Sequence, residues 1–301
     1  MIDTLLKRID ALNNPTVVGL DPTIEMIPAY LKEEKFARFG KTPQAVAEMF
    51  LAFNRAIMEA VQGIVPAVKP QIAFYERYGI PGLMAYEKTA ALAKEMGFIV
   101  IGDIKRGDIG STAAAYAAHI GGTEVAGERF DLWHEDFVTV NPYLGVDGIQ
   151  PFIDACVEAD KGIFVLVKTS NPSSSQLQDI LVDGEPVYMR VAALVDEWGR
   201  SAMGNMGYSR VGAVVGATHK EEGMRIRKAL PNTFFLAPGY GAQGGTAADI
   251  RGFFDKDGRG CIVNSSRGII AAYKKNEKYG ERDFADAARD AALAMKKDLV
   301  G

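Results

Sequence analysis

The protein contains 301 residues, of which 48% are hydrophobic and 24% are charged, and its formal net charge is −4 at pH 7. A chain of this length can bury a large core, in the form of one α/β barrel or of two smaller domains. This net negative charge does not favour binding of nucleic acid, although a local pocket with basic residues can still bind an anion.

The chain ends and the cysteines predict a cytoplasmic protein. Residues 1–8 lack the apolar core of a signal peptide and predict an amphipathic first helix. No apolar stretch approaches the roughly 20 residues that a membrane span requires. Cys156 and Cys261 lie far apart beside apolar runs, without metal-ligand spacing, which is typical of buried thiols in a reducing compartment. We expect no membrane or nucleic-acid partner.

Short apolar or β-branched runs recur along the chain and predict parallel strands, because most are continuously hydrophobic rather than alternating. These runs are residues 16–20, 64–69, 98–103, 137–141, 162–168, 211–216, 233–237 and 261–264. Helical patterns lie between them, at residues 43–61, 84–96, 187–198 and 220–230. The first of these patterns has Thr42 as a candidate N-cap and Pro43 at the first helical position.

The alternation of strands and helices predicts a closed (β/α)8 barrel, with a doubly wound open sheet as the alternative. Nearly every predicted strand ends in polar residues or glycine, and barrel enzymes build their sites from the carboxyl ends of many strands. This distribution favours the barrel. Three connections, residues 22–42, 117–136 and 172–186, are long enough for a short helix or a mobile loop. We find no internal repeat or linker, so we expect one domain, residues 1–301.

A group of charged residues follows the second and third predicted strands. Asp103 and Lys105 stand two apart, so strand alternation points both side chains to one side. Asp108 follows after a glycine, Lys69 ends the preceding strand, and Gln71 shares the facing of Lys69. If these strands are neighbours, alternating charges converge and hold one another ionised. Taken alone, Asp-x-Lys-x-x-Asp fits a solvated strand end as well as a catalytic site.

The loops after the last two predicted strands indicate a phosphate site, residues 238–245 and 264–268. Glycines let backbone amides approach an anion, and Arg267 adds a bidentate donor. Residues 239–244 also fit G-x-G-x-x-G, but this motif lies late in the chain, and Cys261 rather than an acid follows about 20 residues later. A plain glycine-rich turn is the other alternative.

The remaining conspicuous residues predict no site. His119, His134 and His219 have no metal-ligand spacing, and we expect surface or helix-start positions for them. Trp133 and Trp198 are expected to be packing residues. Residues 274–282 resemble a solvated segment.

Residues 103–112, Asp-Ile-Lys-Arg-Gly-Asp-Ile-Gly-Ser-Thr, resemble the signature of orotidine 5'-monophosphate decarboxylases, in particular their longer-chain bacterial branch, type 2. Further matches are Gly19-Leu20-Asp21-Pro22, Val68-Lys69-Pro70-Gln71, Phe74-Tyr75-Glu76, Val140-Asn141-Pro142-Tyr143, Lys168-Thr169-Ser170-Asn171-Pro172 and the stretch from Pro238 to Gly244. The resemblance runs from about Asp21 to Arg267. It implies a barrel of the ribulose-phosphate-binding type and a homodimeric, cofactor-free and metal-free enzyme that forms UMP and CO2 from orotidine 5'-monophosphate.

The resemblance also implies roles for individual residues. It assigns Lys69, Asp103, Lys105 and Asp108 to a charged catalytic network with Lys105 as the proton donor, and Asp108, Ile109 and Thr112 to contacts across a dimer interface. The implied substrate contacts are Asp21, Lys69 and Gln71 near the ribose, Thr169 or Ser170 at the pyrimidine, and Pro238, Gly239, Gly241, Gln243, Asn264 and Arg267 at the phosphate end. Gln243 could also bridge from the phosphate toward the base.

The implied reaction matches the residue types. Loss of CO2 from C6 leaves an electron pair that the ring delocalises poorly, and no cofactor motif offers an electron sink, so the protein must supply electrostatics. Two alternatives stay open. A magnesium-dependent sugar-phosphate decarboxylase or aldolase shares the Asp-x-Lys-x-x-Asp element, although Lys69 would repel its metal ion. A non-catalytic nucleotide-phosphate sensor would explain Arg267 and the glycines, but not the lysine and aspartate pattern.

Overall fold

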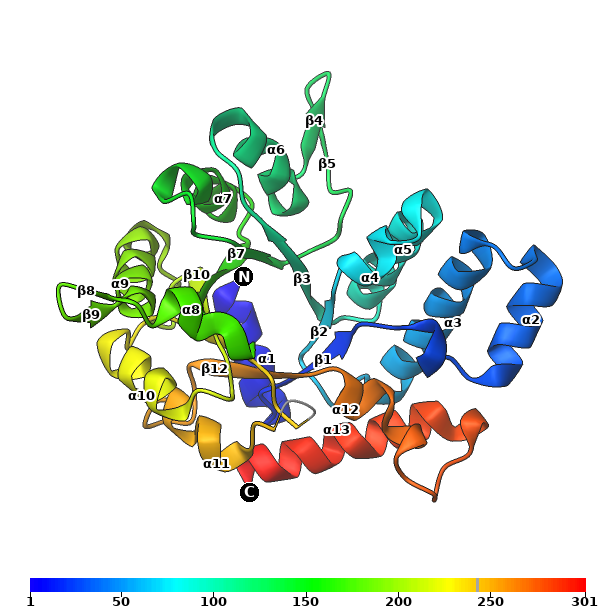
Figure 1. The fold of residues 1–301 in the computed structure, drawn as a ribbon. Helices are drawn as coiled ribbons and strands as arrows, with labels where there is room; N and C mark the ends of the chain where they lie inside the picture. The colour runs from blue at the N-terminus through cyan, green and yellow to red at the C-terminus, as the bar shows by residue number, and fades with distance from the viewer. Residues whose placement is uncertain (242–243) are drawn as a thin grey trace.

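The structure is a computed structural model that describes residues 1–241 and 244–301. Eight parallel strands form a closed barrel in the order β1-β12-β11-β10-β7-β6-β3-β2 (Figure 1). Their bounds are β1 Thr16–Leu20, β2 Ala67–Pro70, β3 Ile99–Arg106, β6 Phe137–Val140, β7 Gly162–Lys168, β10 Val211–Val215, β11 Phe235–Pro238 and β12 Cys261–Ser265. All the predicted strands are present, and because β1 pairs with both β2 and β12, the barrel is confirmed over the open sheet.

Helices alternate with the strands and surround the barrel (Figure 1). The longer helices are α1 Ile2–Leu12, α2 Ala29–Phe39, α3 Pro43–Val61, α5 Gly79–Glu95, α6 Gly110–Gly121, α7 Val146–Glu158, α9 Val187–Gly199, α10 Lys220–Ala229 and α13 Phe284–Val300. Single turns are α4 Ala73–Glu76, α8 Ser175–Gln178, α11 Ala247–Ile250 and α12 Arg267–Ile270. Helix α3 begins where predicted, because the Thr42 side chain accepts a hydrogen bond from the Ala45 amide and Pro43 needs no donor partner.

The long connections contain more structure than the sequence patterns predict. Residues 22–42 form η1 Ile24–Met26 and α2, and residues 172–186 form η2 Pro172–Ser174, α8 and the hairpin β8 Leu181–Val182 with β9 Glu185–Pro186. A second hairpin, β4 Thr123–Val125 with β5 Glu128–Phe130, extends from the end of α6. Remaining 3₁₀ turns are η3 Arg200–Ala202, η4 Arg251–Phe253, η5 Ala272–Lys274 and η6 Glu281–Asp283. Hydrophobic periodicity does not predict such short hairpins, because strands of two or three residues are too short to show an alternating pattern.

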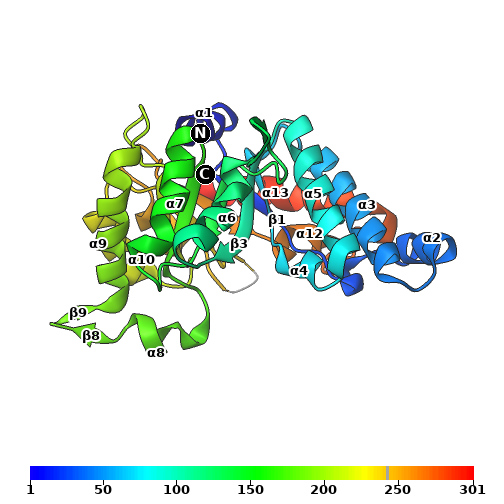
Figure 2. The same cartoon turned by 90° about the horizontal axis from the view of Figure 1, so that it is seen from above.

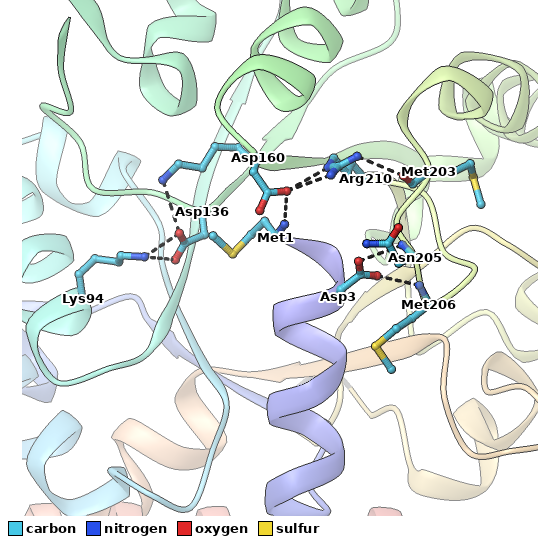
Figure 3. Close-up of polar contacts among 10 residues, drawn as sticks. Met1, Asp3, Lys94, Asp136, Asp160, Met203, Asn205, Met206 and Arg210 are labelled. Carbon is cyan, nitrogen blue, oxygen red and sulfur yellow. Dashed lines mark hydrogen bonds and ion pairs between the residues drawn. The ribbon is translucent and has the colours of Figure 1, made fainter.

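Helix α1 closes the amino-terminal end of the barrel. Its apolar face, Ile2, Leu5, Leu6 and Ile9, is buried in a cluster with residues from the beginnings of the strands, such as Val17 and Ile99. Polar contacts fix this helix: the Met1 ammonium and Arg210 both contact Asp160, and Asp3 accepts hydrogen bonds from the Asn205 and Met206 amides (Figure 3). Figure 2 shows α1 at one end of the barrel and α8 at the other. The open end is therefore the carboxyl end of the strands.

The prediction for His119 is wrong. This histidine lies near the end of α6 with only 6% of its surface exposed, and its Nδ1 lies 2.8 Å from Oε2 of Glu135. Glu135 is fully buried, so it requires partners, which His119 and the Tyr86 hydroxyl provide. Burial raises the pKa of Glu135, and the hydrogen bonds from His119 and Tyr86 offset this only in part. The ring of Trp133 stacks on His119.

Other secondary predictions are confirmed. Cys156 and Cys261 are buried, and burial raises the pKa of the Cys261 thiol to about 12. Trp198 is also buried, and His219 directly precedes α10. Among residues 1–241 and 244–301, no helix combines the length and apolar character that would be needed to cross a membrane.

Candidate active site

A cavity of about 750 Å³ opens at the carboxyl ends of the barrel strands. Most of the predicted site residues line it, although they come from six different strand ends: Asp21, Lys69, Gln71, Asp103, Lys105, Thr169, Ser170, Pro238, Gly239, Asn264 and Arg267. The structure therefore brings the two lysines, the two aspartates and the phosphate-type loops into one site, as predicted.

Asp103 bridges the two lysines at the floor of this cavity. Nζ of Lys69 lies 2.6 Å from Oδ2 of Asp103, and Nζ of Lys105 lies 2.5 Å from Oδ1. The Lys69 side chain is only 4% exposed, whereas 46% of the Lys105 side chain is exposed and faces the cavity. Both lysines line the cavity, but Lys69 is the buried member of the network and Lys105 is the more accessible one.

Burial and charge oppose each other in this network. Burial by itself raises the pKa of Asp103, but Lys69 and Lys105 outweigh it and hold that pKa well below its usual range. Burial lowers the pKa of Lys69, yet the carboxylates of Asp103 and Asp21 raise it above its ordinary value. Both groups are therefore held in their charged forms at neutral pH.

Asp103 and Lys105 meet through a bulge in β3, not through simple strand alternation. Gly102 pairs with Val138 and Arg106 with Val140, so three residues of β3 lie opposite one residue of β6. Lys105 has a φ of 45°, in the left-handed region that non-glycine residues rarely occupy. The predicted common direction of the two side chains is confirmed by their contact, but the predicted reason for it is wrong.

Two buried oxygens in this site have no hydrogen-bond partner among the described residues. These are Oδ1 of Asp21, at the end of β1, and Oδ1 of Asn264, in β12. Burial raises the pKa of Asp21, although Lys69 and Ser266 oppose this effect. Unsatisfied buried acceptors are costly, so both oxygens are well suited to accept hydrogen bonds from a ligand.

The predicted phosphate end is formed by the loops after β11 and β12. Gly239 and Gly241 have φ values of 100° and 70°, which glycine adopts without strain. Arg267 begins α12 and is exposed toward the cavity. Among the described residues that line the cavity, Gly241 is absent. Gln243 lies outside the described residues.

Thr169 and Ser170, directly after β7, differ in their hydrogen bonds. The Thr169 amide donates to Oε1 of Gln178 (3.0 Å), and Nε2 of Gln178 donates to the Thr169 hydroxyl (2.8 Å). Gln178 belongs to α8, which Lys168 also holds through an ion pair with Asp179 (2.5 Å). Within the described part of the chain, the Ser170 hydroxyl has no such side-chain contact, so Ser170 is the freer of the two hydroxyls.

Asp108, Ile109 and Thr112 do not line the cavity of their own barrel. The Asp108 carboxylate accepts a hydrogen bond from the Ile109 amide, and Ile109 is 53% exposed at the start of α6. Leu144, in the loop before α7, and the Asp108 carbonyl both lie close to Gly148, and Leu144 and its neighbour Tyr143 are also exposed. Among the described residues, Asp108, Ile109 and Thr112 therefore lie outside this cavity.

Sequence reasoning missed several lining residues, including the apolar Leu166 and Val214 on inward positions of β7 and β10. Nothing distinguishes them from core residues in a single sequence. Sequence reasoning also missed Thr139, which does not line the cavity but contacts Asp103 and Lys105; it is the only polar residue in β6 and could have been noticed for that reason.

Comparisons with known proteins show the family and support the fold. The family model described as "Orotidine 5'-phosphate decarboxylase / HUMPS family" matches residues 17–281. The orotidine 5'-phosphate decarboxylase of Rhodopirellula baltica is 45% identical and covers 95% of this chain and 94% of its own. That of Caldicellulosiruptor saccharolyticus is 42% identical, with coverage of 99% and 97%. The solved structure of Leishmania donovani OMP decarboxylase superposes with a TM-score of 0.72 at 29% identity, with 98% of both chains covered.

Proposed function

The chain belongs to the orotidine 5'-phosphate decarboxylase / HUMPS family, and we propose that the Lys69–Asp103–Lys105 network carries out its reaction. The reaction is the decarboxylation of orotidine 5'-monophosphate to UMP, a carboxy-lyase step of pyrimidine biosynthesis. The observation that carries the mechanism is the bridging position of Asp103 between a buried and an exposed lysine.

Lys105 is the proposed electrostatic and acid catalyst. As the bond between C6 and the carboxylate breaks, the electron pair left on C6 faces the Lys105 ammonium, which stabilises it and then transfers a proton to form UMP. Two unit charges about 4 Å apart at an effective dielectric near 20 interact by about 4 kcal/mol. Since enzymes lower barriers by about 8–23 kcal/mol, one such contact is insufficient, and preorganisation of the whole network must supply the rest.

The other lining residues are proposed to hold the nucleotide. Asp21 and Lys69 would bind the ribose hydroxyls, with Gln71 nearby, and the unpartnered oxygen of Asp21 supports this role. Ser170 would read the pyrimidine edge, because Gln178 occupies the amide and hydroxyl of Thr169.

The phosphate would lie among the loops after β11 and β12. The proposed contacts are Pro238, Gly239, Gly241, Gln243, Asn264 and Arg267, with Arg267 as the charged donor. Binding energy from the phosphate, which is remote from C6, can then be used to close loops and orient the base.

We also propose a homodimer in which Asp108, Ile109 and Thr112 complete the partner's site. Their exposed position beside Tyr143 and Leu144 supports this assignment, because it leaves a carboxylate and an apolar surface outside the barrel's own cavity. In this arrangement Asp108 faces the departing carboxylate and raises the free energy of the bound substrate.

The whole chain is proposed to be one catalytic domain in the cytoplasm, without a cofactor. The Lys69 ammonium, 2.6 Å from Asp103, supports a metal-free site because it would repel a cation from that carboxylate. The magnesium-dependent relatives within the family are the alternative that this position disfavours.

Release of labelled CO2 from carboxyl-labelled orotidine 5'-monophosphate tests the proposal directly. We expect release that is unchanged by a chelator. Release that requires added magnesium would contradict the metal-free mechanism, and binding of the nucleotide without release would identify a sensor instead.

A further inference from the structure

The bulge in β3 leaves a backbone amide without a partner in the ladder, and a side chain of the neighbouring strand β6 accepts its hydrogen bond. Asp103, Ile104 and Lys105 lie opposite the single residue Thr139, and the regular ladder resumes at Arg106, whose carbonyl accepts from the Asn141 amide (2.8 Å). A bulge removes strand partners from the residues within it. The Lys105 amide therefore needs an acceptor other than a β6 carbonyl.

The Thr139 hydroxyl accepts a hydrogen bond from this amide and donates one to the Asp103 carboxylate. The Lys105 amide donates to Oγ1 of Thr139 (3.0 Å), and the Thr139 hydroxyl donates to Oδ1 of Asp103 (2.9 Å). Oδ1 is also the oxygen that contacts Nζ of Lys105. One hydroxyl thus touches the main chain of Lys105 and the carboxylate that holds its side chain.

We infer that Thr139 is a positioning residue for the reaction: its hydroxyl fixes the Lys105 backbone and the Asp103 carboxylate in one geometry, so that the Lys105 ammonium is presented to C6. This inference rests on the proposed roles of Asp103 and Lys105. Thr139 is 1% exposed and does not line the cavity, so it acts through these two residues and not on the substrate.

A threonine is needed here for its hydroxyl more than for its shape. Valine has nearly the same volume, but it would leave the partly buried Lys105 amide without this acceptor at a backbone position that is already strained. It would also remove one of the two donors to Oδ1 of Asp103. Small displacements of an ammonium group from the reacting carbon reduce the rate far more than they reduce ground-state binding.

The test compares Thr139→Val with Thr139→Ser, which keeps the hydroxyl. We expect Thr139→Val to lower kcat about 10–100-fold, the range for losing a hydrogen bond to a charged group, with KM changed less than about threefold. Thr139→Ser should remain within about threefold of the parent protein. Thr16→Val is a matched control, because Thr16 is a buried strand threonine whose hydroxyl has no partner among the described residues.

A second readout separates positioning from general packing. The affinity for 6-hydroxyuridine 5'-monophosphate, which carries an anionic oxygen at C6, should fall in Thr139→Val by the same factor as kcat, while the affinity for UMP stays unchanged. Equal losses for both ligands, or equal kcat values in the serine and valine variants, would overturn the inference. If Thr139→Val does not fold, Thr139→Cys replaces it, and its kcat is expected to be lower than that of Thr139→Ser.

Failure here is distinguishable from failure of the proposed function. If the parent protein releases CO2 and Lys105→Ala does not, while Thr139→Val matches the parent, only the role of Thr139 is wrong. If Lys105→Ala retains activity, the proposed mechanism itself fails.

Discussion

The ammonium nitrogen of Lys105 lies 2.5 Å from Oδ1 of Asp103, and this contact joins a half-exposed cation to a nearly buried carboxylate. Lys69 occupies the other oxygen of the same carboxylate. The paired charges fix the direction of the Lys105 side chain before any ligand binds. Such preorganisation is what an electrostatic mechanism requires, because no reorganisation has to occur during the reaction.

Lys105→Ala is expected to reduce kcat by at least about 10⁴-fold, because it removes both the cation that stabilises C6 and the proton donor. The Kd for UMP should change less than about tenfold, since the phosphate and ribose contacts remain. Labelled CO2 release and calorimetric titration with UMP measure the two quantities. Lys256→Ala is the control, because Lys256 is exposed and forms an ion pair with its neighbour Asp257. Near-normal turnover in Lys105→Ala would be incompatible with the mechanism.

Arg267→Ala should weaken binding of phosphate-bearing ligands about 10–100-fold, the range for charge-assisted hydrogen bonds. Binding of uridine, which has no phosphate, should be unaffected. Titration of each variant with UMP and with uridine gives the comparison, and Arg55→Ala, an exposed arginine of α3, serves as the control. An equal loss for both ligands would indicate a structural role for Arg267 instead.

Mixing Lys105→Ala with Asp108→Ala tests the shared site. Each variant alone should be inactive, because every site lacks one of the two groups. In a mixed dimer, one site takes Lys105 from one subunit and Asp108 from the other, so random subunit exchange should restore about a quarter of the parent activity. Sedimentation velocity confirms that dimers are present under the assay conditions. A mixture as inactive as its components would place Asp108 in its own barrel's site or outside catalysis.

The pH dependence of stability should report the charge network. Burial raises the pKa of Asp103, but the two lysines lower it by more, so its folded pKa lies below the unfolded value near 4. Its stabilising contribution is therefore present above about pH 4 and is lost as the pH falls toward the folded pKa.

We expect the difference in unfolding free energy between the protein and Asp103→Asn to decrease by about 1.4 kcal/mol for each pH unit below about pH 4. Urea denaturation from about pH 5 to about pH 3 measures this difference. A difference that stays constant over this range would show that Lys69 and Lys105 do not lower the pKa of Asp103.

The sequence by itself determined the barrel and most of the site. Each strand run is a local pattern, and parallel strands bring their polar carboxyl ends to one edge whatever the details of packing. Lys69 and Asp103 could be placed together in this way, because they end two predicted strands, 64–69 and 98–103, that are neighbours in the barrel. The loops that contain Gly239 and Arg267 could be assigned to the same site, because they also follow the carboxyl ends of strands.

Only the tertiary structure decided how these groups are held, since each missing detail depends on a partner distant in the chain. The bulge at Lys105 depends on the register between β3 and β6, which Thr139 stabilises. His119 is buried because Glu135, 16 residues later, requires a partner inside the protein. Among the described residues, Gln178 hydrogen-bonds both the amide and the hydroxyl of Thr169, directly after β7, and makes no such contact with Ser170. Hydrophobic periodicity records which face of an element is buried, but it carries no information on register or side-chain pairing.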